Sequence, residues 1–166
     1  MKILVLNGPN LNLLGEREPE IYGRLTLDEL NQEINRYAAR LNKERPEVMR
    51  IELDFFQSNH EGLLIDTIQG ARLLYEGIVY NPAAHTHYSI ALRDAIASIG
   101  IPVVEVHLSD INSREGFRST SVMKDVCIQQ CMGKNVESYK EALDFLVTYL
   151  EAEAKASPAD LETPGE

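Results

Sequence analysis

Short apolar runs alternate along this chain with longer segments whose apolar residues recur every three or four positions. This alternation constrains the fold most, because the short runs are typical of strands and the periodic segments of helices. Strands are expected at residues 2–7, 48–57, 77–81, 102–108 and 126–132. Helices are expected to begin at Thr26 and at Ser58, and to cover 89–99 and 137–153. The order predicts an α/β fold in which a five-stranded parallel sheet carries helices on both faces.

Local signals mark the ends of several of these elements. Thr26 and Glu29 have the spacing of a capping box, which indicates that a helix begins there. Gly100 is expected to end the helix over 89–99. The last strand is the weakest of the five, because Gln129 and Gln130 interrupt its apolar run.

Length and composition favour one domain followed by a tail. The chain has 166 residues, of which 44% are hydrophobic, and this is enough for one compact core. Residues 1–153 are therefore expected to form a single catalytic α/β domain. Residues 154–166 contain two prolines, one glycine and no apolar period, so we expect an acidic, disordered C-terminal tail there.

Charge and targeting signals exclude several classes of protein. The net charge of −10 argues against nonspecific binding of nucleic acid and against docking on anionic membranes, since both need clustered cations. The first residues lack the apolar stretch of a signal peptide, and no segment is apolar enough to span a bilayer. A cytoplasmic location is expected. Cys127 and Cys131 lack the redox spacing and are interpreted as packing thiols.

Polar side chains gather where the expected strands end. Ligands of an open parallel sheet bind beyond the carboxyl ends of its strands, so these positions are the candidate site. All four histidines fall there, together with amides, arginines, one carboxylate and one phenol. The set is Asn7, Asn10, Asn12, Arg17, Tyr22, Ser58, Asn59, His60, Asn81, His85, Thr86, His87, Glu105, His107, Ser109, Arg114 and Arg118. The chain has no glycine-rich phosphate loop after the first strand and no lysine at a strand end for a Schiff base.

Several of these residues have more than one interpretation. Glu105 and His107 alternate on one strand, and they form either a structural hydrogen-bonded pair or an acid–base histidine with its carboxylate. His85 and His87 could begin a metal site, but two ligands are too few and no cysteine or aspartate completes the set. We therefore expect no metal and no cofactor.

The arginines and the tyrosine also have two interpretations. Arg17 and Tyr22 lie in a long loop and could be ordinary surface residues. Arg114 and Arg118 could be a solvated pair or could together bind a carboxylate.

Four segments of the chain resemble the signatures of type II 3-dehydroquinate dehydratases, in order and at the spacing of that family. They read NGPNLNLLGEREPEIYG at 7–23, FQSNHEG at 56–62, NPAAHTHYSIALRDAI at 81–96 and IPVVEVHLSDINSREGFR at 101–118. Beyond Arg118 the chain resembles the family only in its closing helix. The resemblance implies a dehydratase that converts 3-dehydroquinate to 3-dehydroshikimate and water, in aromatic amino acid biosynthesis or quinate breakdown.

The resemblance also implies a role for each catalytic residue. Tyr22 would take a proton from the carbon beside the ketone, and Arg17 would keep it ionisable, because a phenol with an ordinary pKa of about 10 needs a nearby cation. Asn10 would hold the water that stabilises the enolate oxygen. His107 would protonate the leaving hydroxyl, oriented by Glu105.

The family's binding residues and assembly can be carried over in the same way. The substrate would be held by Asn81, His87, Arg118 and the backbone of Leu108 and Ser109; Arg114 would help to close the site. Asp94 would reach in from a neighbouring subunit. The resemblance further implies a flavodoxin-like fold of strand order 2-1-3-4-5 and a homododecamer built of four trimers.

The chain departs from the family pattern in the fourth signature and after it. Asp110 and Asn112 stand where the family often has Asn and His, and Asp110 brings negative charge near the expected carboxylate site. The fifth strand, with the trimer contacts around it, lacks the usual glycine-rich pattern. Two alternatives remain, a non-catalytic flavodoxin-like module that binds a small molecule and a flavin-binding electron carrier.

Overall fold

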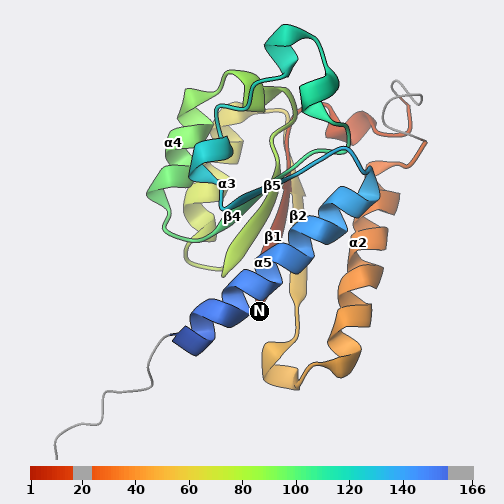
Figure 1. Cartoon of the computed structure of the whole chain (residues 1–166), viewed down its shortest axis with the longest axis vertical. Helices are drawn as coiled ribbons and strands as arrows, with labels where there is room; N and C mark the ends of the chain where they lie inside the picture. The colour runs from red at the N-terminus through yellow and green to blue at the C-terminus, as the bar shows by residue number, and fades with distance from the viewer. Residues whose placement is uncertain (17–23, 157–166) are drawn as a thin grey trace, which may run out of the picture.

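Five parallel strands form one sheet in the order β2-β1-β3-β4-β5. The structure is a computed structural model and describes residues 1–16 and 24–156. The strands are β1 (Lys2–Asn7), β2 (Glu52–Gln57), β3 (Gly77–Asn81), β4 (Val103–Val106) and β5 (Gln129–Cys131), and Figure 1 shows them at the centre of the molecule. The predicted α/β class, the parallel sheet and the flavodoxin-like strand order are confirmed.

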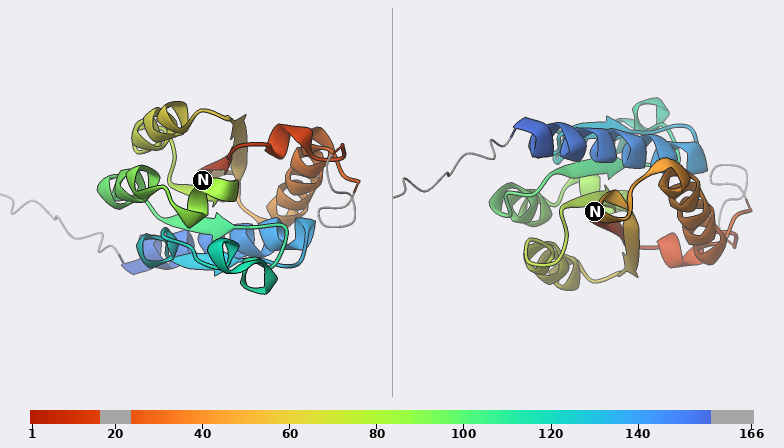
Figure 2. Two further views of the ribbon diagram at one scale, coloured as in Figure 1. Left: turned by 90° about the horizontal axis from the view of Figure 1, so that it is seen from above. Right: turned by 90° about the horizontal axis from the view of Figure 1, so that it is seen from below.

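Helices cover both faces of the sheet, so the domain has three layers (Figure 2). The helices α2 (Leu27–Leu41) and α5 (Val136–Ala156) pack on one face, and α3 (Glu61–Ala71) and α4 (Ile90–Ser98) on the other. Successive residues of β1 therefore enter different cores. Ile3 and Val5 pack with α2 and α5, whereas Leu4 and Leu6 pack with α3 and α4. A central parallel strand needs this continuous apolar run because both of its faces are buried.

The register places the carboxyl ends of neighbouring strands at one level. Asn7, the last residue of β1, is paired with Gln57 of β2 and Asn81 of β3. On the other side of β3, Glu105 is paired with Tyr80. The loops that follow these strands therefore meet at one edge of the sheet.

Several element boundaries differ from the prediction. The strand expected from Val48 begins at Glu52, because Glu47–Met49 form a 3-10 turn instead. The amide side chain of Asn42 holds the backbone of Ile51 through two hydrogen bonds, which explains why pairing starts only after it. The helix expected from Ser58 starts at Glu61, since the Ser58 hydroxyl accepts a hydrogen bond from the N–H of His60.

The strands predicted over 2–7 and 77–81 are confirmed, whereas the last two strands are shorter than expected and the last helix is longer. The strand predicted over 102–108 spans Val103–Val106, and the one predicted over 126–132 spans Gln129–Cys131. The predicted capping box of Thr26 and Glu29 is present. The last helix continues through Ala156, so the boundary at residue 153 was placed too early, and residues 157–166 of the predicted tail lie outside the described residues. Among the helices of the described chain, none is both long and apolar enough to cross a membrane.

Candidate active site

A cleft of about 150 Å³ opens where the loops after β1, β3 and β4 meet. The loop after β1 contains the short helix η1 (Leu11–Leu13), the loop after β3 contains η4 (Ala83–His87), and the loop after β4 contains η5 (Ile111–Ser113) and η6 (Gly116–Arg118). The cleft is lined by Pro9, Asn10, Leu11, Leu14, Ala83, Ala84, His87, His107, Ser109, Ile111, Arg114 and Arg118. Six of the predicted site residues are therefore brought together, which are Asn10, His87, His107, Ser109, Arg114 and Arg118.

The backbone is strained on two walls of this cleft. Asn10 and Ala83 adopt the left-handed conformation, with φ of 66° and 51°. Each is held by a side chain from a strand end or the loop after it, because Asn59 Oδ1 accepts the N–H of Asn10 at 2.8 Å and Asn81 Oδ1 accepts the N–H of Ala83 at 3.1 Å. Residues held in such conformations are frequent at binding sites, where the surrounding structure fixes their geometry.

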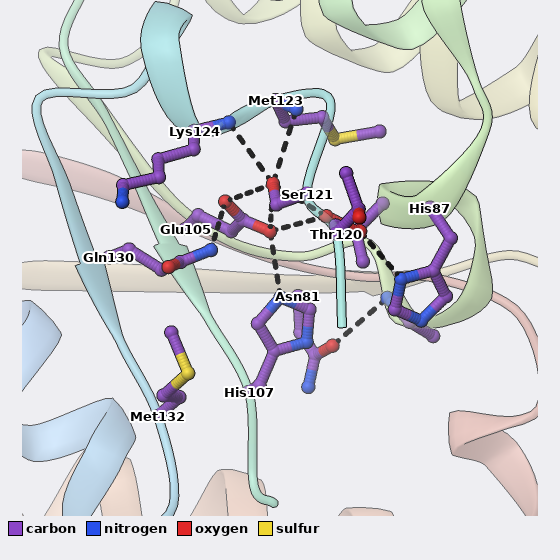
Figure 3. Close-up of polar contacts among 12 residues, drawn as sticks. Asn81, His87, Glu105, His107, Thr120, Ser121, Met123, Lys124, Gln130 and Met132 are labelled. Carbon is purple, nitrogen blue, oxygen red and sulfur yellow. Dashed lines mark hydrogen bonds and ion pairs between the residues drawn. The ribbon is translucent and has the colours of Figure 1, made fainter. Parts of the chain in front are cut away.

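His107 is held by Glu105 directly behind the cleft. The two side chains come from the end of β4 and the loop after it, and His107 Nε2 lies 2.7 Å from Glu105 Oε1 (Figure 3). Glu105 is completely buried, whereas His107 lies on the cleft wall. Since Nε2 is occupied by the carboxylate, Nδ1 is the nitrogen that remains for a ligand.

Glu105 is stabilised as a carboxylate in spite of its burial. Burial by itself raises the pKa of this carboxyl group, but hydrogen bonds from His107, Thr86 and Ser121 and the charge of His107 lower it by more, so its pKa lies below the ordinary value. Ser121 Oγ lies 2.9 Å from Oε2, and Gln130 Nε2 lies 2.8 Å from the same oxygen. An ionised carboxylate next to an imidazole favours the protonated imidazole, which is the form of a general acid.

His87 presents the opposite nitrogen to the cleft. Its Nδ1 lies 2.8 Å from the carbonyl oxygen of Thr120. A carbonyl oxygen can only accept a hydrogen bond, so Nδ1 carries the proton and Nε2 is left as the atom that can bind a ligand. Neutral His87 can therefore accept a hydrogen bond from a hydroxyl group through Nε2.

Two arginines supply positive charge on the side of η5 and η6. Arg114 Nε and Arg118 Nε lie 3.8 Å and 3.6 Å from Glu115 Oε2, and Glu115 itself is largely exposed. Both guanidinium groups line the cleft. Guanidinium pairs bind carboxylates well, so this wall suits an anionic ligand even though the whole chain is acidic.

Asn81 lies beneath the cleft and does not line it. Its Nδ2 donates to Tyr139 Oη at 2.8 Å, and Tyr139 in turn donates to Asn7 Oδ1 at 2.7 Å. All three side chains are buried. Any contact between Asn81 and a substrate stays a prediction, since one amide proton of Asn81 is already used and its oxygen holds Ala83.

Four predicted site residues lie elsewhere or outside the described chain. Asp94 is on the exposed surface of α4, 3.5 Å from Arg93, and does not reach the cleft of its own subunit. Leu108 is buried, and its carbonyl accepts the N–H of Asn135. Arg17 and Tyr22 lie outside the described residues.

The unusual Asp110 is turned away from the expected carboxylate site. Its Oδ1 accepts the N–H of Asn112 at 2.9 Å and so caps η5. Asn112 contacts Met132 Sδ through Nδ2. Both replacements therefore stabilise the loop after β4, and neither is among the residues lining the cleft.

His85 and His87 are not arranged as a ligand pair. His85 is buried against the edge of the Tyr88 ring, whereas His87 faces the cleft. Burial lowers the pKa of His85, so it stays neutral. Within the part of the chain that the structure describes, no three His, Cys, Asp or Glu side chains are grouped closely enough to hold a metal ion.

Comparison with known proteins identifies the family. The profile of the family described as "Dehydroquinase class II" matches residues 1–147. The chain belongs to the class II dehydroquinase family. It is 53% identical over 145 residues to a 3-dehydroquinate dehydratase of Bacillus pumilus, covering 87% of this chain and 93% of that protein.

Solved class II dehydroquinases share the whole architecture. The type II dehydroquinase of Butyrivibrio crossotus is 49% identical and superposes with a TM-score of 0.81, covering 88% of this chain and 97% of that one. The type II dehydroquinase of Propionibacterium acnes is 37% identical with a TM-score of 0.80, covering 89% and 96%. The resemblance seen in the four sequence segments is thereby confirmed for the family.

Sequence reasoning missed two polar residues behind Glu105 and His107 of this class II dehydroquinase, which are Ser121 and Gln130. Thr86, the third side chain that contacts Glu105, was in the candidate set but had no assigned role. The only signal for Gln130 was a polar residue inside an apolar run, which had been interpreted as a weakness of the strand.

Proposed function

We propose that the protein removes water from 3-dehydroquinate to give 3-dehydroshikimate, without a metal or cofactor. The observation that carries this proposal is His107, which lies at the cleft with the buried carboxylate of Glu105 behind it. Membership of the class II dehydroquinase family supports the substrate, and so do the similar proteins named 3-dehydroquinate dehydratase.

The first chemical step is removal of a proton from the carbon beside the ketone. By the resemblance to the family, Tyr22 is the base and Arg17 lowers its pKa; both lie outside the described residues. The resulting enolate carries negative charge on the former ketone oxygen. Asn10, held at the cleft by Asn59, is placed to hold a water against that oxygen.

The second step breaks the bond between carbon and the leaving hydroxyl. The electrons of the enolate form the new carbon–carbon double bond, and the hydroxyl leaves with a proton from His107 Nδ1 as water. Glu105 supports this step because it holds Nε2 and so orients the ring with Nδ1 toward the cleft. His107 is then neutral and must be protonated again by solvent.

Binding of the substrate follows from the charges of the cleft. Its carboxylate pairs with Arg118, with Arg114 closing that wall. A ring hydroxyl donates to His87 Nε2, and the backbone around Ser109 binds a second polar group. Asn81 contributes indirectly, because its Oδ1 accepts a hydrogen bond from the N–H of Ala83 on the cleft wall.

We further propose a homododecamer of four trimers in the cytoplasm. Asp94 and Ile90 are four residues apart on α4 and both are exposed, which suits a face covered by a neighbouring subunit. In that assembly Asp94 contributes to the site of the neighbour. Cys127 and Cys131 are free thiols, which the reducing cytoplasm maintains.

The test is an ultraviolet assay for the conjugated enone formed from 3-dehydroquinate. The parent is expected to be active with a chelator present, whereas His107→Ala and Tyr22→Phe each lose roughly a hundredfold or more in kcat, as general acid–base groups do. His60→Ala is the matched control, because His60 is exposed at the same edge and does not line the cleft. A parent that forms no enone, or that loses its activity to the chelator, contradicts the proposal.

A further inference from the structure

Gln130 points its amide at the buried carboxylate of Glu105. The two residues are register partners on β5 and β4, and Gln130 Nε2 lies 2.8 Å from Glu105 Oε2 (Figure 3). The neighbouring Gln129 is on the opposite face of the same strand and is exposed. Gln130 does not line the cleft, so it cannot act on a substrate directly.

Ser121 directs its hydroxyl proton at the carboxylate of Glu105. Its Oγ accepts the N–H groups of Met123 and Lys124, at 3.2 and 3.1 Å. These two bonds occupy the acceptor positions of the hydroxyl oxygen, so its hydrogen is left to donate. Ser121 Oγ lies 2.9 Å from Glu105 Oε2 and 3.0 Å from Oε1, and the nearby hydroxyl of Thr86, 2.9 Å away, itself donates to Oε1.

The Oε2 atom of Glu105 is therefore surrounded by obligate donors. An amide –NH2 cannot accept a proton, and Ser121 has no free acceptor position. A proton on Oε2 would break one of these hydrogen bonds and leave a buried donor unsatisfied, which is costly. The oxygen that faces His107 is Oε1, and it accepts hydrogen bonds from Thr86 and Ser121 as well. With donors around both oxygens, the proton that Glu105 and His107 share is directed to the imidazole.

We propose that Gln130 and Ser121 are positioning residues that keep Glu105 ionised, so that His107 offers a protonated Nδ1 to the cleft. The proposal rests on the function proposed above, in which His107 is the general acid. It explains why the apolar run of β5 is interrupted by Gln130. An apolar residue at this position would leave Glu105 Oε2 with one hydrogen-bond donor fewer.

The other ionisable groups around Glu105 and His107 do not exchange the proton that these two residues share. Burial raises the pKa of Tyr80 on β3 and of Cys127 before β5, so both stay neutral. Arg114 and Arg118 face the same cleft and stay charged at every working pH. His87 on η4 is the other histidine of the cleft, and its resonance must be followed separately.

The experiment is an NMR titration of the His107 ring in the full-length, unliganded protein, with Gln130→Met and Gln129→Met as a matched pair. Without the Gln130 donor the Glu105 carboxylate becomes more basic and takes over part of the proton that the imidazole carries in the parent. The His107 ring is therefore protonated only at lower pH, and its midpoint is expected to fall by about half a unit to one unit. The kcat for dehydration should fall by about tenfold with KM nearly unchanged. Gln129→Met should match the parent in each measurement.

Gln130→Glu serves as a second variant that keeps the shape of the side chain. The added carboxylate removes the donor and lies nearer Glu105 than His107, so it raises the basicity of Glu105 most, and the His107 midpoint should fall at least as far as in Gln130→Met. His107 midpoints that match or exceed that of the parent in these folded variants overturn the inference, even if kcat falls. The titration needs no turnover, so a parent that lacks dehydratase activity refutes the proposed function without deciding the titration result.

Discussion

A single hydroxyl group, that of Tyr139, connects α5 to the ends of β1 and β3. It donates to Asn7 and accepts from Asn81, and the ring is fully buried. Burial raises the pKa of Tyr139, and the bond from Asn81 only partly opposes this, so the phenol stays neutral and keeps its donor. The hydrogen bond to Asn81 also affects the shape of the cleft, because the side-chain amide of Asn81 holds Ala83 in its left-handed conformation.

Tyr139→Phe is expected to reduce both stability and substrate binding. The change leaves two buried polar groups without a partner, each costing about 1–3 kcal/mol, so the free energy of unfolding should fall by about 2–6 kcal/mol. KM should rise because Asn81 is released, whereas kcat changes less. Denaturant unfolding and steady-state kinetics measure the two effects. Tyr149→Phe, on the same helix but half-buried, is the control, and equal stability of the two variants would refute the role of this hydroxyl.

At the scale of elements, the site depends on how closely the loops after β1 and β3 approach each other. Gly8 donates its N–H to Asn81 O at 2.7 Å, and a Cβ atom on Gly8 would lie 2.6 Å from Pro82 O. That contact is with backbone, so no side-chain rotation can relieve it. A larger residue must push the two loops apart, and both carry residues of the cleft.

Gly8→Ala should therefore lower activity more than a surface change does. We expect a loss of stability of about 1–3 kcal/mol, as for other overpacked sites, together with a lower kcat/KM. Gly62→Ala is the matched control, because a Cβ there meets nothing within 4 Å and helix propensity favours alanine by up to about 1 kcal/mol. Thermal unfolding and the enone assay compare the two. Full activity in Gly8→Ala would show that the loops can separate without harm.

At the scale of the whole molecule, five exposed apolar side chains lie on or next to α3 and α4. They are Leu63, Leu73, Leu74, Tyr88 and Ile90. Ile90 is 55% exposed, and Asp94 lies one turn further along the same helix with 68% of its side chain exposed. Exposed apolar groups of this kind often mark contacts between proteins.

Assembly of the subunits is expected to depend on this surface. Light scattering should give the parent a mass twelve times that of the chain, and Ile90→Glu should dissociate it because a buried, unpaired charge is costly. Activity should fall with the mass, since Asp94 no longer reaches a neighbour. Val48→Glu is the control, because Val48 is 88% exposed on the turn before β2, away from α4. A monomeric parent with full activity would contradict both the assembly and the role of Asp94.

The sequence predicted the edge of the sheet on which the site lies, and it predicted the polar residues of the cleft wall. His107 follows β4 directly, whereas His87, Arg114 and Arg118 lie in the loops after β3 and β4; the end of a strand is a local feature of the sequence. The partners of Glu105 could not be found in the same way. Gln130 lies 25 residues from Glu105 along the chain, and its contact depends on the register of β5 against β4.

The sequence by itself determined the order of strands and helices, the parallel sheet and the family, because apolar periodicity and signature motifs are properties of neighbouring residues. Tertiary structure alone decided which donors surround Glu105, that Asn81 turns to Tyr139 beneath the cleft, and that Asp110 caps a turn. Each of these depends on the direction of a buried side chain. That direction is set by packing and hydrogen bonding between segments far apart in the chain, which no local pattern records.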